Sequence, residues 1–391
     1  MIKNLDKKAN MCYYAANIIL TIKVMLASST LVDLKIGDSV LSAIYLGLIL
    51  IVLIFQKYRI KDLVLFSVIG LLATYTCLKN NNFYLMFSCL GCFAIKYVDL
   101  RKLLKYRYYT KIIIIVAHIL YTFIIFLTDP QTIPTIERGS EIRYYFYLGQ
   151  PNTFQMYVLW TTLEILFVHY RTLKSINLII AFATNIFFYY FTDSNSSILV
   201  LIFTLVLIYF AKQKKKSYFM VNYIAKYGYF IMTGLLFLMT HLYTRTGIVG
   251  AILKIVNKIM TGRLAYGAYA FQQNGVTIFG SELGFNELVF WNGQWYDDLY
   301  LDSAYLALIL QYGLIWVCII GFGIYKCAKL KDIKINIFLS SYIMYGIMES
   351  YVLDASVCFP ILFIGKIYFG RRKKMKYNQN IIEYQKLRSI R

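Results

Sequence analysis

The amino-acid sequence predicts an all-α polytopic membrane protein, and three observations support this prediction. Of its 391 residues, 59% are hydrophobic and only 15% are charged, which is more apolar than a water-soluble fold of this size can bury. Apolar runs of roughly 17 to 25 residues recur from end to end, and as helices they would span about 30 Å of hydrocarbon. The period-two alternation of a membrane β-barrel is absent, so we expect helices.

The apolar runs form a single transmembrane domain, residues 1–391, with about twelve transmembrane helices. The expected spans are residues 11–31, 38–55, 61–78, 83–95, 112–128, 153–168, 175–191, 196–211, 218–241, 302–325, 335–350 and 353–369. We expect the first span to remain as an anchor, because it lacks the small-residue cleavage site of a signal peptide. Two long connections, residues 129–152 and 242–301, are candidates for function, and the second follows the ninth span.

The basic residues predict the orientation. If the N-terminus is cytoplasmic, 31 of the 41 Lys and Arg residues fall on the cytoplasmic side and 8 fall outside. Because positive residues concentrate in cytoplasmic loops, we predict that both termini are cytoplasmic, including the basic tail 370–391, and that both long connections are external loops. The net charge of +22 therefore reflects membrane topology and not a nucleic-acid partner.

The cysteines and the remaining motifs exclude several function classes. All seven cysteines lie within or beside apolar spans, where thiols behave as small hydrophobic groups, so no disulfide framework is expected. The lone CxxC pair, Cys89 and Cys92, is interpreted as helix packing. No His, Cys and Asp cluster has metal-ligand spacing, so no metal site is predicted. No phosphate-binding glycine loop is present, which argues against a nucleotide cofactor or an enzyme that uses ATP.

The second external loop, residues 242–301, is predicted to begin with an amphipathic helix. Its apolar residues recur at helical spacing, at Ile248, Ile252, Ile255, Val256 and Ile259. Two lysines, Lys254 and Lys258, occupy another face. A thirteenth span would reverse the charge topology, so we expect this helix to lie on the outer leaflet.

The same loop ends in an aromatic and polar segment that contains Trp291, Trp295 and Asp298. Aromatic faces beside amides and carboxylates suit sugar rings, whose C–H faces stack while their hydroxyls form hydrogen bonds. The alternative is that Trp and Tyr lie here only because they favour the membrane interface.

Two arginines on the predicted external side are candidate anion-binding residues. Arg143 precedes an aromatic segment that ends at Asn152, and a guanidinium group matches phosphate oxygens bidentately. Its alternative role is an interfacial anchor. Arg263 follows Gly262 at an expected helix start, where free N–H groups favour an anion. Its alternative role is a structural salt bridge with an external acid.

Three further residues could carry chemistry. Asp302 lies at the membrane boundary, where partial desolvation would raise its pKa and suit it to act as a general base. His241 is the one histidine near the external face. Glu164 lies in mid-span, where an ionisable residue is a functional candidate, and it could instead pair with a basic residue such as Lys23.

Four local patterns recur along the chain in the order in which they occur in one protein family. They are RYYFYLGQPN at residues 143–152, FTDSNS at 191–196, TGR at 261–263 with IFG at 278–280, and DSAY at 302–305 with QYG at 311–313. Over roughly residues 130–325 the chain resembles the Wzy-type bacterial polysaccharide polymerases of the O-antigen polymerase and ligase superfamily. Two positions depart from the family's pattern, since Gln150 replaces its histidine and Asn195 stands where it often has arginine.

The resemblance implies a metal-independent glycosyltransferase of the C-type membrane class, in the bacterial cytoplasmic membrane with its active face external. Its substrates would be oligosaccharide repeats linked to polyprenyl (undecaprenyl) diphosphate, polymerised into a capsular, exopolysaccharide or O-antigen-like glycan. A flippase and a chain-length regulator would be its protein partners. Arg143 and Arg263 would stabilise the diphosphate leaving group, and Asp302 would be the base. The implied substrate-binding residues are Asn152, Trp291, Trp295, Tyr305, Asp298 and His241, the last two being reserve candidates for the base.

Two alternatives remain open. One is a ligase that moves finished glycan onto a different acceptor. The other is a flippase or other transporter of lipid-linked oligosaccharide. Transporters tend to place polar groups at mid-membrane between repeated halves, whereas this chain concentrates them in unequal external loops, which favours a transferase.

Overall fold

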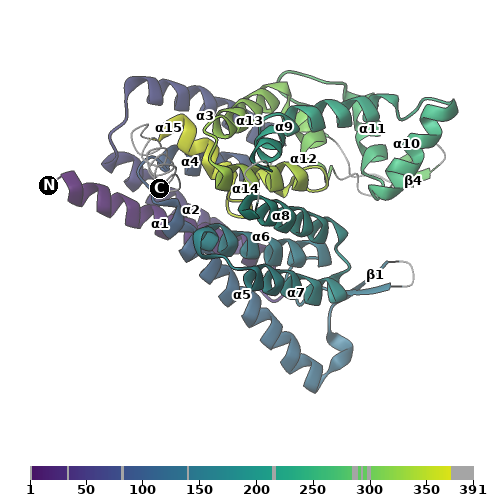
Figure 1. The fold of residues 1–391 in the computed structure, drawn as a ribbon, viewed down its shortest axis with the longest axis horizontal. Coiled ribbons are helices and arrows are strands. Elements are labelled where there is room, and N and C mark those ends of the chain that lie inside the picture. The colour runs from purple at the N-terminus through teal and green to yellow at the C-terminus, as the bar shows by residue number, and fades with distance from the viewer. Residues whose placement is uncertain are drawn as a thin grey trace.

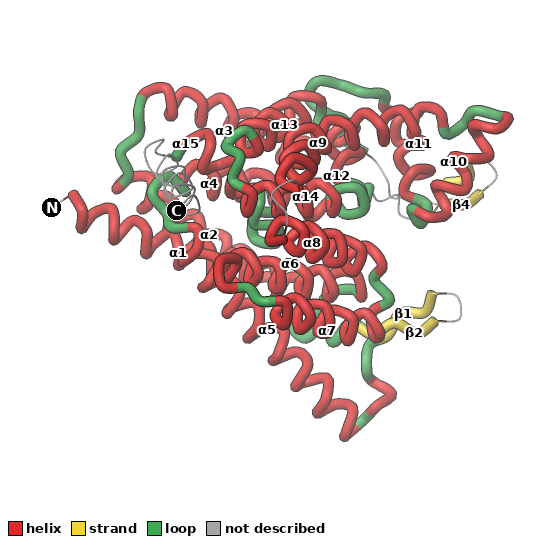
Figure 2. The backbone as a smooth tube through the Cα atoms, viewed as in Figure 1, coloured by secondary structure: helices red, strands yellow, loops and turns green. Residues whose placement is uncertain are grey.

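The computed structural model describes residues 2–32, 35–80, 83–138, 141–213, 217–283, 289–291, 294–296 and 301–370, and the predicted helical fold is confirmed within them (Figures 1 and 2). Strands in the described residues form two short antiparallel hairpins. They pair β1 (Thr135–Arg138) with β2 (Glu141–Tyr144), and β3 (Val289–Trp291) with β4 (Gln294–Tyr296).

Seven helices in the described part of the chain are long and apolar enough to cross a membrane. They are α1 (Ile2–Ala27), α2 (Lys35–Phe55), α3 (Ile60–Asn80), α5 (Leu100–Thr128), α7 (Ser175–Thr192), α8 (Asn195–Gln213) and α9 (Ser217–Leu242). Two shorter apolar helices are α4 (Tyr84–Ala94) and α13 (Leu314–Ala328). Large apolar side chains such as Ile54 and Leu71 are exposed on these helices, as expected for a surface in contact with lipid. The protein is therefore a helical membrane protein, and the number of twelve spans stays a prediction.

The centre of the fold is α6 (Pro151–His169), which packs against α5, α7 and α8. Pro151 suits the first position of a helix, where its missing N–H would have no partner. Trp160 and Leu163 on α6 are fully buried. Two further helices, α14 (Ile333–Tyr345) and α15 (Ile361–Phe369), complete this interior, and short 3-10 turns occupy residues Pro130–Thr132 and Tyr170–Thr172.

The tenth predicted span, residues 302–325, is interrupted. α12 (Ala304–Leu306) continues into a π-helical turn (Ala307–Tyr312), and a new helix, α13, begins only after Gly313. Gly313 has a φ of 96°, a conformation that side-chain-bearing residues rarely adopt. The sequence remains apolar on both sides of this glycine, so hydropathy alone did not predict the interruption.

The last two predicted spans, residues 335–350 and 353–369, are also shorter than expected. α14 ends at Tyr345, and the chain runs through a 3-10 turn (Ser350–Leu353) and irregular backbone before α15 begins at Ile361. We call residues 346–360 the irregular segment. Its backbone is satisfied by side chains: the Ser88 hydroxyl donates to the Leu353 carbonyl at 2.8 Å and accepts from the Ala355 N–H at 2.9 Å. Such backbone is tolerated within a membrane protein only when it is buried in this way.

Glu164 does not pair with Lys23. Its Oε1 lies 2.9 Å from both the Arg107 Nη2 and the Lys111 Nζ, and all three side chains are fully buried. Lys23 instead lies 3.2 Å from Asp38. The reason is that α5 begins at Leu100 and not near residue 112, so two basic residues expected in a cytoplasmic loop lie inside a helix.

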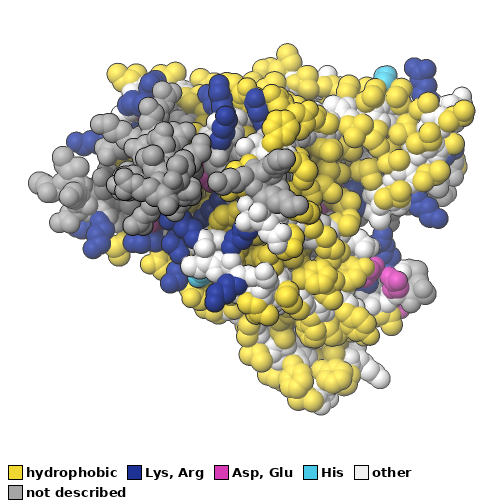
Figure 3. Space-filling model, in the orientation of Figure 1, with side chains coloured by type: hydrophobic (Ala, Val, Ile, Leu, Met, Phe, Trp, Pro, Cys, Tyr) yellow, Lys and Arg dark blue, Asp and Glu magenta, His cyan; other side chains and the backbone are white. Residues whose placement is uncertain are grey.

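The two ends of the molecule differ. In Figure 1 the start of α1 and the helix α15 lie at the left, whereas the β1–β2 hairpin and α10 (Gly247–Ile259) lie at the right, which we call the hairpin end. Lys and Arg gather mainly towards the left in Figure 3. The predicted amphipathic helix is confirmed as α10, and it is followed by α11 (Arg263–Asn274). The β1–β2 hairpin and α10, which belong to the two long connections, thus lie at one end of the molecule, and their external location stays a prediction.

Candidate functional site

Arg143 is a buried residue that joins three elements at the hairpin end. From β2 its Nε donates to the Thr192 carbonyl at 2.7 Å, and its Nη2 donates to the Asp193 carbonyl at 3.2 Å and to Asn152 Oδ1 at 2.8 Å. Only 7% of the residue is exposed, so it is not an interfacial anchor that reaches towards water. These bonds use Nε and Nη2 and leave Nη1 for another partner.

The contacts of Arg143 follow from the end of α7. The last carbonyls of a helix lack intrahelical partners and carry the negative end of the helix dipole, which a cation stabilises. Asp193 then turns the chain with a φ of 46°, and α8 begins two residues later at Asn195. The predicted residues Arg143 and Asn152 are therefore brought together beside the α7–α8 turn.

Arg263 lies at the first turn of α11 and forms an ion cluster. Its Nη2 lies 3.2 Å from Asp302 Oδ2 and 3.4 Å from Glu349 Oε1. Its Nη1 donates to the Met260 carbonyl at 3.3 Å and to the Thr261 hydroxyl. The turn before it has positive φ at both Thr261 and Gly262, which reverses the chain from α10 into α11.

The two carboxylates of this cluster differ in exposure. Asp302, just before α12, keeps 39% of its side chain exposed, and burial of the remainder raises its pKa while the Arg263 charge opposes the shift. Glu349, in the turn after α14, is almost fully buried, and burial raises its pKa to about 7 against the opposing charge of Arg263. The Ser196 hydroxyl donates to Glu349 Oε1 at 2.9 Å.

Sequence reasoning missed Glu349, because it falls in the predicted span 335–350, whose average hydropathy is high. The signal that could have found it is the one that singled out Glu164: an acid inside an apolar run needs a partner or a function. Its partner, Arg263, is 86 residues away in the chain and could not be paired with it by spacing.

Arg143 contacts the stretch just before α8 directly, and Arg263 is linked to the first turn of α8 through Glu349. Arg143 binds the carbonyls of Thr192 and Asp193, and Arg263 shares Glu349 with Ser196. The buried hydroxyls of Ser194 and Ser197 make no hydrogen bond within the described residues. A helix N-terminus with unused donors and two nearby guanidinium groups is suited to bind an anion.

A backbone clasp joins the second long connection to the turn before α13. The N–H groups of Ser281 and Leu314 donate to the carbonyls of Leu310 and Thr277, at 3.0 and 3.1 Å. Gly280 and Gly313 allow this approach, since a Cβ on Gly280 would lie 2.0 Å from the Gln311 carbonyl oxygen. The clasp joins IFG at residues 278–280 to QYG at 311–313, two of the patterns noted in the sequence.

The remaining predicted site residues lie elsewhere. The Tyr305 hydroxyl donates to the Ile343 carbonyl at 2.8 Å and its ring is buried. The Trp291 indole N–H donates to Gln272 Oε1 at 2.9 Å. The exposed His241 ring packs on Phe271 with centroids 5.5 Å apart. Asp298 and the side chain of Trp295 lie outside the described residues.

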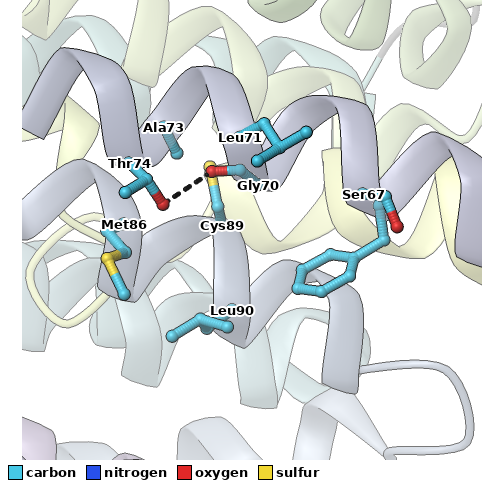
Figure 4. Close-up of a pocket in the computed structure, with 9 residues that line it drawn as sticks. Ser67, Gly70, Leu71, Ala73, Thr74, Met86, Cys89 and Leu90 are labelled. Carbon is cyan, nitrogen blue, oxygen red and sulfur yellow. Dashed lines mark hydrogen bonds between the residues drawn. The ribbon is translucent and has the colours of Figure 1, made fainter.

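A separate apolar cavity of about 450 Å³ opens between α3 and α4 (Figure 4). Phe66, Ala73 and Leu90 are among its lining residues, and the Thr74 hydroxyl at its edge donates to the Gly70 carbonyl at 2.9 Å. No charged side chain lines it, so the ionic chemistry belongs to the Arg143 and Arg263 site and not to this cavity.

Fold and site together define a helical membrane protein with an arginine and carboxylate cluster at its hairpin end. Comparisons of the chain with protein-family models, with curated proteins and with solved structures find no match.

Proposed function

We propose that the protein is a membrane glycosyltransferase that polymerises oligosaccharide repeats linked to polyprenyl diphosphate, on the external face of the bacterial cytoplasmic membrane. The hairpin end would be external. Two observations carry the proposal. Arg143 contacts the carbonyls just before α8, and the ion cluster of Arg263, Asp302 and Glu349 reaches the first turn of α8 through Ser196. A reaction with an anionic leaving group and a hydroxyl nucleophile needs this combination of buried cations and a base.

The diphosphate would bind at the start of α8. Arg143 Nη1 has no partner among the described residues and could contact its oxygens. Arg263, which is linked to this turn through Glu349 and Ser196, would exchange part of its interaction with Asp302 for one with phosphate. The donors are fixed in a buried site, so they need little reorganisation as negative charge grows on the leaving group.

Asp302 is the proposed general base because it is the accessible carboxylate of the cluster. A hydroxyl oxygen of the incoming repeat would form a bond to the anomeric carbon of the growing chain. The bond from that carbon to the diphosphate oxygen would break, its electron pair would remain on the diphosphate, and the hydroxyl proton would pass to Asp302. Glu349, which is buried and bonded to Ser196, would hold Arg263 in place.

The structure offers an argument against the transporter alternative. An ion cluster does lie between helices α5 and α6, but Arg107, Lys111 and Glu164 are fully buried and bonded to one another and to backbone carbonyls. Charges that serve transport normally face a pathway. A ligase would use the same site with a different acceptor, so the acceptor that becomes extended in a purified assay distinguishes it from a polymerase.

The test is single-turnover transfer between purified lipid-linked repeats by an Asp302→Asn variant. Asparagine keeps the shape but removes the basic site, so the rate of transfer should fall by about 10² or more while the lipid-linked donor still binds. Glu137→Gln, which alters an exposed acid on β1, is the matched control and should transfer at the wild-type rate. A normal rate for Asp302→Asn in folded protein would remove Asp302 as the base.

A further inference from the structure

α10 carries an apolar stripe that the rest of the described chain leaves uncovered. Ile248, Ile252, Ile255 and Ile259 are 80%, 53%, 64% and 71% exposed, and their spacing of three and four residues places them on one line along the helix. Leu253 on the opposite face is buried. We call these four residues the isoleucine stripe.

The surroundings of the stripe indicate that lipid covers it. Only residues 243–246 separate α10 from α9, a helix apolar enough to span a membrane. Exposed apolar side chains such as Phe230, Leu235 and Leu238 line α9, so the stripe continues a surface that already faces the bilayer. The right-hand part of Figure 3 shows hydrophobic side chains over this region.

The polar residues of α10 fit a helix that lies in the plane of the membrane surface. Lys254 and Lys258 are exposed and lie on one side of the stripe, where their ammonium groups would reach lipid phosphates. A second copy of the chain would need complementary carboxylates opposite these lysines. A bilayer supplies both the hydrocarbon and the anionic groups, and so we commit to it as the occupant.

Asn257 connects α10 to the first turn of α11. Its Oδ1 accepts from the Ala265 N–H at 2.9 Å, and its backbone carbonyl accepts from the Gly262 N–H at 2.9 Å. Gly262 precedes Arg263 and has no side chain to cap the helix, so Asn257 supplies the cap from the preceding helix. Movement of α10 would therefore move the backbone that carries Arg263.

We propose that α10 inserts its isoleucine stripe into the leaflet at the hairpin end. The lipid then fixes the position of α10, and the hydrogen bonds of Asn257 fix the position of Arg263 relative to α10. The first half of the proposal concerns membrane docking and is independent of any activity. The second half rests on the proposed function, because it makes lipid contact a determinant of where Arg263 meets the diphosphate.

Docking is tested by fluorescence quenching in lipid nanodiscs that hold one protein each, made of phosphatidylcholine and phosphatidylglycerol. Ile255→Cys, in a background without the native cysteines, carries an environment-sensitive dye. Lipids with a nitroxide on the acyl chain should quench this dye, and aqueous iodide should not. The same dye at Lys254→Cys, on the lysine side of the helix, should respond to iodide. Iodide quenching at position 255 would overturn the proposal, since the stripe would then face water or a missing protein partner.

Coupling is tested with Ile252→Ser/Ile255→Ser and with Asn257→Ala. The double serine variant should lose acyl-chain quenching, measured from Ile259→Cys, and slow single-turnover transfer roughly tenfold or more. Asn257→Ala should keep the quenching and lose a similar factor in rate, with donor affinity changed little. Full transfer activity in either variant would overturn the coupling. Absence of transfer in the wild-type protein, with quenching as expected, would refute the proposed function and leave the docking intact.

Discussion

The protein contains two buried ion clusters that use similar residues in different ways. In the inner cluster, Arg107 and Lys111 share one carboxylate of Glu164, and all three side chains are fully buried. In the cluster at the hairpin end, one guanidinium, Arg263, is shared by Asp302 and Glu349. The inner cluster has an excess of cations and the outer one an excess of acids.

The two clusters differ in their hydrogen-bond partners and in their exposure to solvent. The inner cations turn to the irregular segment: Arg107 donates to the Ala355 and Ser356 carbonyls at 2.6 and 2.5 Å, and Lys111 donates to the Val357 carbonyl at 3.2 Å. All three side chains of the inner cluster are fully buried, although Arg107 Nε and Glu164 Oε2 have no hydrogen-bond partner among the described residues. The outer cluster keeps Asp302 partly exposed, and the buried Arg263 Nε has no partner among the described residues. Both clusters therefore contain unpartnered buried atoms, and the exposure of Asp302 is what distinguishes the cluster at the hairpin end.

The largest effect expected from this comparison concerns stability. Glu164→Ala would leave two buried cations without their carboxylate, and removing one partner of a buried ion pair costs about 3–5 kcal/mol of folding free energy. The variant should fail to accumulate in membranes or should unfold at a much lower temperature in detergent. Accumulation and thermal unfolding are the measurements, with Glu164→Asp as a milder control. An Ala variant as stable as the wild type would show that the inner cluster does not hold the irregular segment.

The outer cluster should respond differently, with a loss of rate and little loss of stability. Arg263→Lys keeps the charge but loses the planar fork, and we expect single-turnover transfer to fall about 10²-fold. Arg143→Lys should be impaired by a smaller factor. If both arginines serve one transition state, the double variant should be little worse than Arg263→Lys alone. Multiplicative losses in the double variant would instead place the two residues in separate steps.

The smallest effect concerns the pH dependence of stability through Glu349. Its folded-state pKa of about 7 lies above the ordinary value, so the folded protein holds this proton more tightly than the unfolded chain does. The stabilisation is therefore fully present below the ordinary pKa and is lost as the pH rises through 7. Glu349→Gln mimics the protonated form. Its melting temperature should match that of the wild type near pH 5 and exceed it by a few degrees near pH 8.

Measurement of both melting temperatures from pH 5 to 8 checks this sign, and the difference between the two proteins removes the contribution of other titrating groups. A wild-type protein that gains stability over the variant as the pH rises would mean that the ion pair with Arg263 outweighs burial. The role of Glu349 would then be that of a permanently charged partner.

Hydropathy and residue periodicity were sufficient to predict the helical membrane fold and the amphipathic α10. They were not sufficient for the interruption at Gly313 or for the irregular segment. A hydropathy window reports composition, whereas a helix break within an apolar run depends on partners elsewhere. The carbonyl of Leu353 is satisfied by Ser88, which lies 265 residues earlier in the chain.

The candidate site was predicted in part for the same reason. Arg143 and Arg263 could be selected because arginine is rare on the predicted external side, and Asp302 because it lies at a predicted membrane boundary. The structure brings Arg263 and Asp302 together. Their link to Arg143 through the start of α8 depends on Glu349 and Ser196, and neither stands out in an apolar sequence. Tyr305 was selected by pattern alone, and its hydroxyl is committed to the core.

The backbone clasp also bears on how the chain is made. Lys79, at the end of α3, donates to the Gly280 carbonyl at 2.6 Å across 201 residues, and Asn80 donates to the Gln311 carbonyl across 231. At about 5 to 20 residues per second, a ribosome needs roughly 10 to 40 seconds to synthesise the chain between Lys79 and its acceptor. During that interval the end of α3 lacks both of these acceptors. The early helices must therefore be apolar enough to remain stable in the bilayer without these contacts. The clasp can form only once the last third of the protein has been synthesised.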